Sequence, residues 1–232
     1  MYIILDEKKQ MNQKDLILVR KNILTADQCK LLINEFKERS KSANKEHCAN
    51  AVTGKLTMST FDVVNLIPES KTFNLINNKI SNFTKDYINF LKEKNSVSAY
   101  VVEKTFNFAH AFRLMCYKKG GWIHPHIDWT HGIHGSCTIN LNEGYEGGEF
   151  YFFNGKHKVE LKTGDGLIFP ANPFWIHEVK EVTKYERYSV NCFITSLPFQ
   201  KIQELNTIHE AMENLNYVKN NPHKLNYIKT YD

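Results

Sequence analysis

The chain has 232 residues, of which 42% are hydrophobic and 24% are charged, and these are ordinary values for a globular protein. The formal net charge of +5 is mild, and it permits an acidic or phosphorylated partner without requiring one. Five cysteines without a Cys-x-x-Cys pair argue against a disulfide framework or a zinc–thiolate site. The first apolar run is too short for a signal peptide, and no run of 18 apolar residues occurs. We therefore expect a cytoplasmic protein without a membrane span.

Glycine is distributed unevenly, and this divides the chain into two parts. Ten of the 11 glycines lie within residues 120–166, and Gly54 is the one earlier glycine. The first part therefore suits helices, whereas the middle part is rich in tight turns between short strands. Before the first helix, residues 15–20 are typical of a strand. The polar region 41–68 is expected to be irregular, with a short strand at 61–66.

Two helices are expected in the first hundred residues. Thr25-Ala26-Asp27-Gln28 is a capping-box signature that opens the first helix, which continues to about Ser40. The second helix is predicted from about Lys71 to Glu93. Apolar positions in the first helix indicate a stripe that faces the core, and apolar residues in the second recur every three or four positions, which indicates packing against a sheet. The stripes consist of Leu31, Leu32, Ile33 and Phe36 in the first helix, and of Phe73, Ile76, Ile80, Phe83, Tyr87 and Phe90 in the second.

From about residue 105 the pattern changes to short apolar runs separated by glycine turns. The eight runs are 112–118, 122–129, 136–141, 149–153, 157–161, 166–170, 175–180 and 187–194. Short strands at this spacing predict a sandwich or jelly roll. A helical pattern returns at 200–217, and the tail after Asn220 is polar and expected to be loose. The helix carries Ile202, Leu205, Ile208, Met212 and Leu215 on its apolar stripe.

These elements predict an α+β chain that is mainly β. No internal repeat or linker is evident, so we interpret residues 1–232 as a single domain. Residues 1–104 are expected to form a helical and β buttress, and residues 105–197 the β core. Residues 198–232 would then form a C-terminal helix and tail.

Two residues with metal-ligating side chains lie two positions apart in one predicted strand. His126 and Asp128 should share one face of the strand at 122–129, because side chains alternate between the faces of a sheet. His177 lies 51 residues after His126, in another predicted strand. Two histidines and one carboxylate leave coordination positions open, and they are the ligand set of non-heme Fe(II) oxygenases. The sequence therefore predicts an iron site at these three residues.

Other histidines compete for a place in this site. His124 lies on the same predicted strand face as His126, and such a pair would indicate a cupin-type metal site. That site also needs a glutamate a few residues later, and none is present, so we interpret His124 as a rim residue. His131 and His134 fall in a glycine-flanked turn, and they are expected to face solvent or the edge of a substrate.

Arg187 opens a predicted strand whose two faces differ in polarity. Positions 187, 189 and 191 are polar, whereas positions 190, 192 and 194 are apolar or small. A buried strand with one polar face predicts a lined cavity, and an arginine buried there needs a partner of opposite charge. A dicarboxylate cosubstrate would supply that partner, and Ser189 could add a hydroxyl donor.

Two alternatives to this role of Arg187 remain open. The arginine could form a surface ion pair with Glu178 or Glu186 instead. Arg113, in the predicted strand at 112–118, could assist or replace it as the anion anchor. Tyr117 lies on the same face as Arg113, and taken alone it is interpreted as an ordinary core residue.

Taken together, residues 105–197 resemble the 2-oxoglutarate- and Fe(II)-dependent dioxygenases, most nearly their prolyl 4-hydroxylase-like branch. The resemblance is carried by Tyr117, His126-x-Asp128, Leu141-Asn142-Glu143, Glu146-Gly147-Gly148-Glu149, the segment 164–169, His177 and Arg187. It implies a distorted double-stranded β-helix, or jelly roll, braced by the N-terminal helices. It also implies that His126, Asp128 and His177 hold Fe(II), that Arg187 and Tyr117 contact the distal carboxylate of 2-oxoglutarate, and that dioxygen takes the last position on the iron.

The activity implied by this resemblance is hydroxylation of a substrate C–H bond with release of succinate and CO2. Peptidyl-proline is the first substrate expected, and the partner is a peptide, a protein or a small molecule, with no oligomeric state inferred. An AlkB-like nucleic-acid demethylase is the first alternative. That family places a second arginine six residues after the first, where this chain has Phe193, so a nucleic-acid partner is not expected. A non-enzymatic jelly-roll binding module is the second alternative. Near the ligands, Trp122, Trp129 and Trp175 either line a substrate groove or belong to the core.

Overall fold

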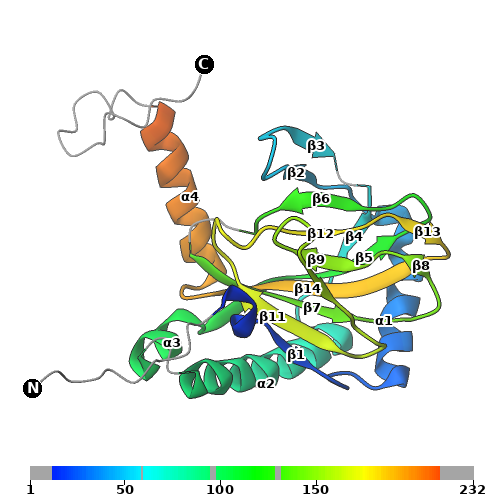
Figure 1. Ribbon diagram of the computed structural model, residues 1–232, viewed down its shortest axis with the longest axis horizontal. Coiled ribbons are helices and arrows are strands. Elements are labelled where there is room, and N and C mark those ends of the chain that lie inside the picture. The colour runs from blue at the N-terminus through cyan, green and yellow to red at the C-terminus, as the bar shows by residue number, and fades with distance from the viewer. Residues whose placement is uncertain (1–11, 59, 95–97, 129–131, 215–232) are drawn as a thin grey trace, which may run out of the picture.

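Two open antiparallel sheets form the centre of the protein in the computed structural model, which describes residues 12–58, 60–94, 98–128 and 132–214 (Figure 1). The larger sheet contains, in spatial order, β1 (Leu18–Arg20), β11 (Gly166–Pro170), β7 (Ile133–Asn140), β14 (Arg187–Thr195), β5 (Phe108–Tyr117) and β4 (Asp62–Asn65). The smaller sheet contains β10 (His157–Val159), β9 (Phe150–Phe152), β12 (His177–Val179) and β6 (Ile123–His126). The expectation of a mainly β chain is confirmed.

Two two-stranded sheets and four α-helices complete the described structure. The pairs are β2 (His47–Ala49) with β3 (Leu56–Met58), and β8 (Glu146–Gly147) with β13 (Val182–Lys184). The helices are α1 (Ala26–Arg39), α2 (Lys71–Glu93), α3 (Ala99–Thr105) and α4 (Phe199–Asn214), and short 3-10 helices occur at Gln13–Leu16 and Ser40–Ser42. In Figure 1, α2 runs beneath the larger sheet, whereas β2 and β3 lie at the opposite side of the molecule.

The apolar core has two layers, one on each face of the larger sheet. In the first layer, buried side chains of α1 and α2 pack on this sheet, as the predicted stripes require. In the second layer, the larger and smaller sheets pack on each other through residues such as Met115, Phe152 and Phe169. The helices therefore cover one face of the larger sheet and leave the other face to the second sheet.

Alternation along β14 explains why a cavity forms between the two sheets. Val190, Cys192 and Ile194 belong to the helix-side core, as their apolar character predicts. The residues that alternate with them, Arg187, Ser189, Asn191 and Phe193, line the cavity instead. The predicted difference between the two faces of this strand is therefore present in the structure.

The helix starts and stripes were largely predictable. Thr25 and Gln28 form both hydrogen bonds of a capping box at the start of α1. Leu32 and Phe36 are buried as expected, but Leu31 is 39% exposed, because the buried face of α1 follows positions 29, 32 and 36.

Several element boundaries differ from the predictions. Strand β6 ends at His126, so the strand predicted to reach residue 129 is shorter. Its partner β12 begins at His177, directly opposite, and the ladder has no further pairing to continue. The region 41–68 was expected to be irregular apart from one strand, but it also contains the β2–β3 pair. Helix α3 and the β8–β13 pair were not predicted, because their runs are too short to show a period.

The C-terminal helix is present but is less buried than its stripe predicts. Ile202 is 2% exposed, whereas Leu205 and Ile208 are 41% and 53% exposed. Leu215, the tail after Asn220 and residues 1–11 lie outside the described residues, as does the side chain of Met212. Among the helices that the structure describes, each is too short or too polar to cross a membrane.

Replacing the capping residue of α1 tests how much this helix start contributes to stability. Thr25→Ala should lower the free energy of unfolding by about 1 kcal/mol, because the backbone N–H of Gln28 loses its acceptor. Thr25→Ser keeps a hydroxyl at this position and should leave stability nearly unchanged. Urea denaturation followed by circular dichroism measures both variants, and an equal loss for Ala and Ser would contradict the capping role.

Candidate metal centre and its cavity

Three ligand-type side chains converge where β6 and β12 pair. His126 ends β6 and His177 begins β12, and the two residues lie opposite each other in the ladder. Asp128 lies two residues beyond the end of β6 rather than within a strand, yet its carboxylate reaches both rings. Nε2 of His126 is 3.4 Å from its Oδ1, and Nε2 of His177 is 3.3 Å from its Oδ2. One ligand atom from each residue lies within 4.8 Å of the others, so the three could hold one metal ion.

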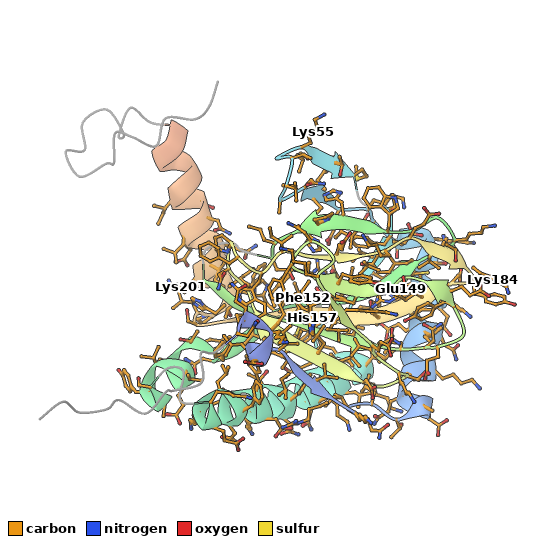
Figure 2. The ribbon with its side chains drawn as sticks, viewed as in Figure 1. Lys55, Glu149, Phe152, His157, Lys184 and Lys201 are labelled. Atoms are coloured by element: carbon orange, nitrogen blue, oxygen red, sulfur yellow. The ribbon has the colours of Figure 1, made fainter. Side chains whose placement is uncertain are left out.

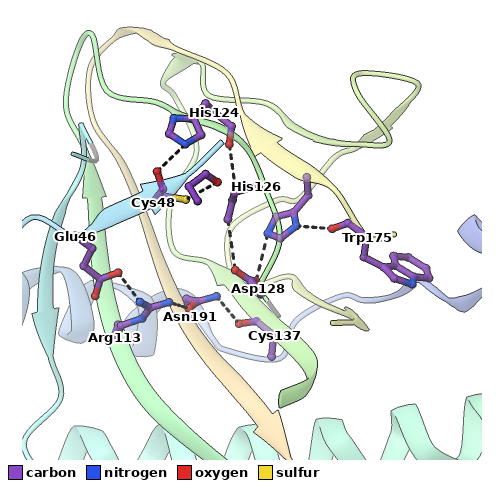
Figure 3. Close-up of polar contacts among 11 residues, drawn as sticks. Glu46, Cys48, Arg113, His124, His126, Asp128, Cys137, Trp175 and Asn191 are labelled. Atoms are coloured by element: carbon purple, nitrogen blue, oxygen red, sulfur yellow. Dashed lines mark hydrogen bonds and ion pairs between the residues drawn. The ribbon is translucent and has the colours of Figure 1, made fainter. Parts of the chain in front are cut away.

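Both imidazoles are oriented by main-chain carbonyl groups. Nδ1 of His126 lies 3.0 Å from the carbonyl oxygen of His124, and Nδ1 of His177 lies 3.0 Å from that of Trp175 (Figure 3). A carbonyl oxygen only accepts hydrogen bonds, so each Nδ1 must carry the proton. In the neutral rings, Nε2 then has a free lone pair directed toward Asp128, which is how metal-binding histidines are commonly arranged.

Burial sets the protonation of this centre. Burial lowers the pKa of His126, and the neighbouring His177 lowers it further, so His126 is neutral at pH 7. Burial alone would raise the pKa of Asp128, but the two imidazoles hold it well below its usual range. Phe150 stacks on His177 with ring centres 5.5 Å apart, and Phe169 meets the same ring edge-on at 4.8 Å. The centre therefore combines an ionised Asp128 and a neutral His126 with an aromatic wall.

Arg187 lies in the same cavity of about 290 Å³ as the three ligand residues. It is 3% exposed, its Nε is buried without a partner, and its guanidinium lies 5.2 Å from the centre of the Tyr117 ring. Among the described residues, no carboxylate forms an ion pair with it. Ser189 and Tyr117 line the cavity beside it, and burial raises the pKa of Tyr117, so its hydroxyl stays protonated. A buried cation without a counter-ion is costly, which favours an anionic ligand here.

Asn142 and Gly148 help to hold Arg187 in this position. The side-chain amide of Asn142 donates to the carbonyl oxygen of Glu186 at 2.8 Å and accepts from the backbone N–H of Tyr188 at 2.8 Å. It thereby fixes the main chain on both sides of Arg187. Gly148 leaves room for the aliphatic part of Arg187, since a Cβ added to the glycine would lie 3.1 Å from Cδ of the arginine. Its φ of +67° also favours glycine at this position.

The structure distinguishes Arg187 from Arg113 as the anchor for an anion. The surface ion pair of Arg187 does not form, because Glu178 pairs with Lys180 at 2.9 Å and Glu186 accepts from the hydroxyl of Tyr188. Arg113 also lines the cavity, but it is already engaged. It donates to Glu46 at 2.6 Å and to Asn191. Of the two arginines, Arg187 is therefore the better anchor for a ligand carboxylate.

Among the described residues, His124 and His134 do not join the three ligand-type side chains. His124 was interpreted as a rim residue, but it is 7% exposed, and its ring bonds to Thr57 Oγ1 and the carbonyl oxygen of Cys48, each at 3.1 Å. The prediction of a rim position is wrong because β2 and β3, which were not predicted, cover the His124 ring. His134 is half-buried and its Nε2 lies 2.9 Å from the hydroxyl of Ser196. His131 lies outside the described residues.

The described tryptophans near the ligands do not line the cavity. Trp175 is 3% exposed and packs against Phe152 and Phe153 in the core, so it does not line the cavity. Trp122 is half-buried outside the cavity lining, and Trp129 lies outside the described residues. Residues 46–49, which form part of the cavity wall, were not predicted from the sequence, because a strand of only three residues has no periodic signal.

Part of the chain matches a model of a known protein family. Residues 112–195 match the family model described as the 2OG-Fe(II) oxygenase superfamily. A search of the curated proteins gives no match.

Several solved prolyl hydroxylases are similar in structure. A prolyl-4-hydroxylase of Pseudomonas putida has 18% identity and a TM-score of 0.59, over 78% of this chain and 93% of that chain. A viral collagen prolyl hydroxylase from Paramecium Bursaria Chlorella virus-1, in a 2OG complex, has 17% identity and a TM-score of 0.56, over 79% and 97% of the two chains. A Trichoplax adhaerens prolyl hydroxylase, in complex with a peptide of hypoxia inducible factor, has 14% identity and a TM-score of 0.59, over 82% and 87%. The expected double-stranded β-helix is thereby confirmed.

Divalent metal binding at this centre should weaken as the pH falls. Metal binds neutral imidazole, so protons compete with it once the histidines become charged. Because the pKa of His126 is lowered, its ring stays neutral below the usual histidine value of 6.5, and Asp128 remains ionised. Mn(II) affinity, measured by electron paramagnetic resonance, should thus be nearly constant between about pH 8 and pH 7 and fall below about pH 6. A loss of affinity already at neutral pH would contradict this assignment of protons.

Proposed function

We propose that this 2-oxoglutarate- and Fe(II)-dependent dioxygenase hydroxylates an aliphatic C–H bond of its substrate, with peptidyl-proline as the first substrate class to test. One observation carries the proposal. Two imidazole nitrogens, one carboxylate and a buried guanidinium without a described counter-ion share one cavity between the two sheets. The proposal requires each of these groups to have a distinct role.

The donor set fits iron. His126, Asp128 and His177 would provide two nitrogen ligands and one oxygen ligand, and they would leave the remaining positions open. Both histidines already have the tautomer that ligation requires. The same donors would bind other divalent metals, so the choice of Fe(II) follows from the chemistry of the family rather than from affinity.

The cavity beyond these ligands fits a dicarboxylate. Arg187 would pair with the distal carboxylate of 2-oxoglutarate, and the hydroxyls of Tyr117 and Ser189 would donate to it. When bound with dioxygen, the iron and 2-oxoglutarate supply the oxidation that converts a C–H to a C–OH and yields succinate and CO2. The residues of this chain hold the ligands, balance the charge of the cosubstrate and exclude water from the buried end of the cavity.

A peptide substrate is supported more than a nucleic acid. A peptide is bound in the similar structure from Trichoplax adhaerens. Phe193 lines the cavity at the position where a second arginine would be expected in a nucleic-acid demethylase. Lys55 on β2–β3, Lys184 on β13 and Lys201 on α4 lie far apart (Figure 2), so these positive charges do not form one phosphate-binding surface.

Loss of one metal ligand should abolish turnover without unfolding the protein. Wild-type protein loaded with Fe(II) and 2-oxoglutarate without oxygen should show a weak visible charge-transfer band, and succinate should appear when oxygen is admitted. His126→Ala and Asp128→Ala should lose both the band and succinate release, while circular dichroism stays unchanged. His157→Ala is the control, since this histidine on β10 does not line the cavity. Retained activity in either ligand variant would refute the assignment.

Loss of Arg187 should act on the cosubstrate alone. Arg187→Ala should weaken 2-oxoglutarate binding by about 2 kcal/mol, or about 30-fold, because a charge-assisted pair in a buried site is removed. The dissociation constant is measured by calorimetry on the Mn(II)-loaded protein. Arg187→Lys keeps the charge but not the fork of donors, and it should lose less affinity. An unchanged constant in Arg187→Ala would transfer the anchoring role to Arg113.

A further inference from the structure

The cavity that contains the candidate metal centre has a deep end and an outer end. Along β14, Arg187, Ser189, Asn191 and Phe193 line it in turn. The first two are 3% and 2% exposed, whereas the last two are half-buried. Arg187 and Asn191 are four residues apart on one strand, which corresponds to about 13 Å. A cosubstrate anchored at Arg187 would therefore occupy the deep end and leave the outer end for the substrate.

A polar cluster occupies the outer end. Arg113 on β5 donates one hydrogen bond to Oε2 of Glu46 at 2.6 Å and another to Oδ1 of Asn191, its partner across the β5–β14 ladder (Figure 3). The amide of Asn191 then donates to the carbonyl oxygen of Cys137 at 3.2 Å. The guanidinium also lies 4.7 Å from the centre of the Phe193 ring. These contacts fix the orientation of the cluster before any ligand binds.

The cluster offers donor and acceptor groups side by side. Its Arg113 and Glu46 side chains are 13% and 38% exposed, so a ligand in the cavity can reach them. A guanidinium has five N–H donors and a carboxylate accepts several hydrogen bonds, so their mutual contact saturates neither group. Because the two charges balance, the cluster has little net charge. This separates it from Arg187, which attracts an anion.

Building on the proposed function, we propose that Glu46, Arg113 and Asn191 form the substrate-recognition subsite of the enzyme. The subsite takes a group that has an N–H donor next to a carbonyl or carboxylate oxygen. The donor binds Glu46 and the oxygen binds the guanidinium of Arg113. Phe193 and Ile133, which line the same end, provide an apolar wall for the part of the substrate that is hydroxylated.

Two kinds of molecule carry this pair of groups next to a proline ring. One is a peptide chain, through its main-chain N–H and C=O groups. The other is a free α-amino acid, through its ammonium and carboxylate. The two probes are therefore the capped peptide acetyl-Gly-Ala-Pro-Ala-Gly-amide and free L-proline, and whichever binds identifies the source of the head group.

Binding is measured by calorimetry on the full chain loaded with Mn(II) and 2-oxoglutarate, which prevents turnover. One probe should bind, and Arg113→Gln and Glu46→Gln should each weaken it by about tenfold or more, because each removes one of the two charged groups that hydrogen-bond the probe. Both variants should bind 2-oxoglutarate within about twofold of wild type, since Arg187 is intact. Lys45→Gln is the matched control, because this neighbour pairs with Asp62 at 3.1 Å and does not line the cavity. It should leave probe binding unchanged.

Three further results bear on the subsite. Arg113→Lys keeps a cation and should recover part of the probe affinity, whereas a purely structural role would give no recovery. Equal probe affinity in wild type, Arg113→Gln and Glu46→Gln would overturn the subsite, as would the absence of binding by both probes in wild type. Mn(II) and 2-oxoglutarate are titrated first. If either fails to bind the wild-type protein, the proposed function fails, and the subsite fails with it.

Discussion

The pairing of β12 with β6 is the contact on which the site depends. It joins two segments that are 51 residues apart and places His177 opposite His126 at the edge of the smaller sheet. The short reach of an imidazole makes this register essential, because a slip of one residue would turn one ring to the other face of the sheet. Asp128 follows immediately in a segment released from the ladder, and its carboxylate can therefore turn back between the two rings.

Electrostatics divides the interior along β14. At the buried end, Arg187 has an aromatic neighbour and no described counter-ion, so an incoming anion would gain from the low local dielectric. At the more exposed end, Glu46 balances the charge of Arg113. The pair has little net charge but presents donors and acceptors in fixed directions. As proposed above, the two arginines that face one cavity would serve different ligands, because Arg187 would select for charge and Arg113 for the geometry of donors and acceptors.

The sequence was sufficient for those features that follow from local rules. A capping box, helix stripes and the alternation at 187–194 predicted α1, α2 and the two faces of β14, and the spacing of His126, Asp128 and His177 predicted a shared site. What failed depends on tertiary partners. The length of β6 is set by where β12 begins, and the burial of His124 by the β2–β3 pair. Glu46 was missed for the same reason, since its place in the cavity wall comes from the ladder that positions β5 and from its bond to Arg113.

The hydrogen bonds from Nδ1 of the two histidines have a consequence for how this centre tolerates change. Their acceptors are the carbonyl groups of residues 124 and 175, which every amino acid provides. The orientation of the two rings therefore depends on the path of the backbone and not on the side chains at residues 124 and 175. In centres where a carboxylate side chain orients the histidine, replacing that side chain removes the acceptor. Sequence drift at those two positions can alter packing around the rings while their direction persists. The orientation of the two rings is in this sense encoded by strand conformation, and it would persist if the side chains of residues 124 and 175 were replaced.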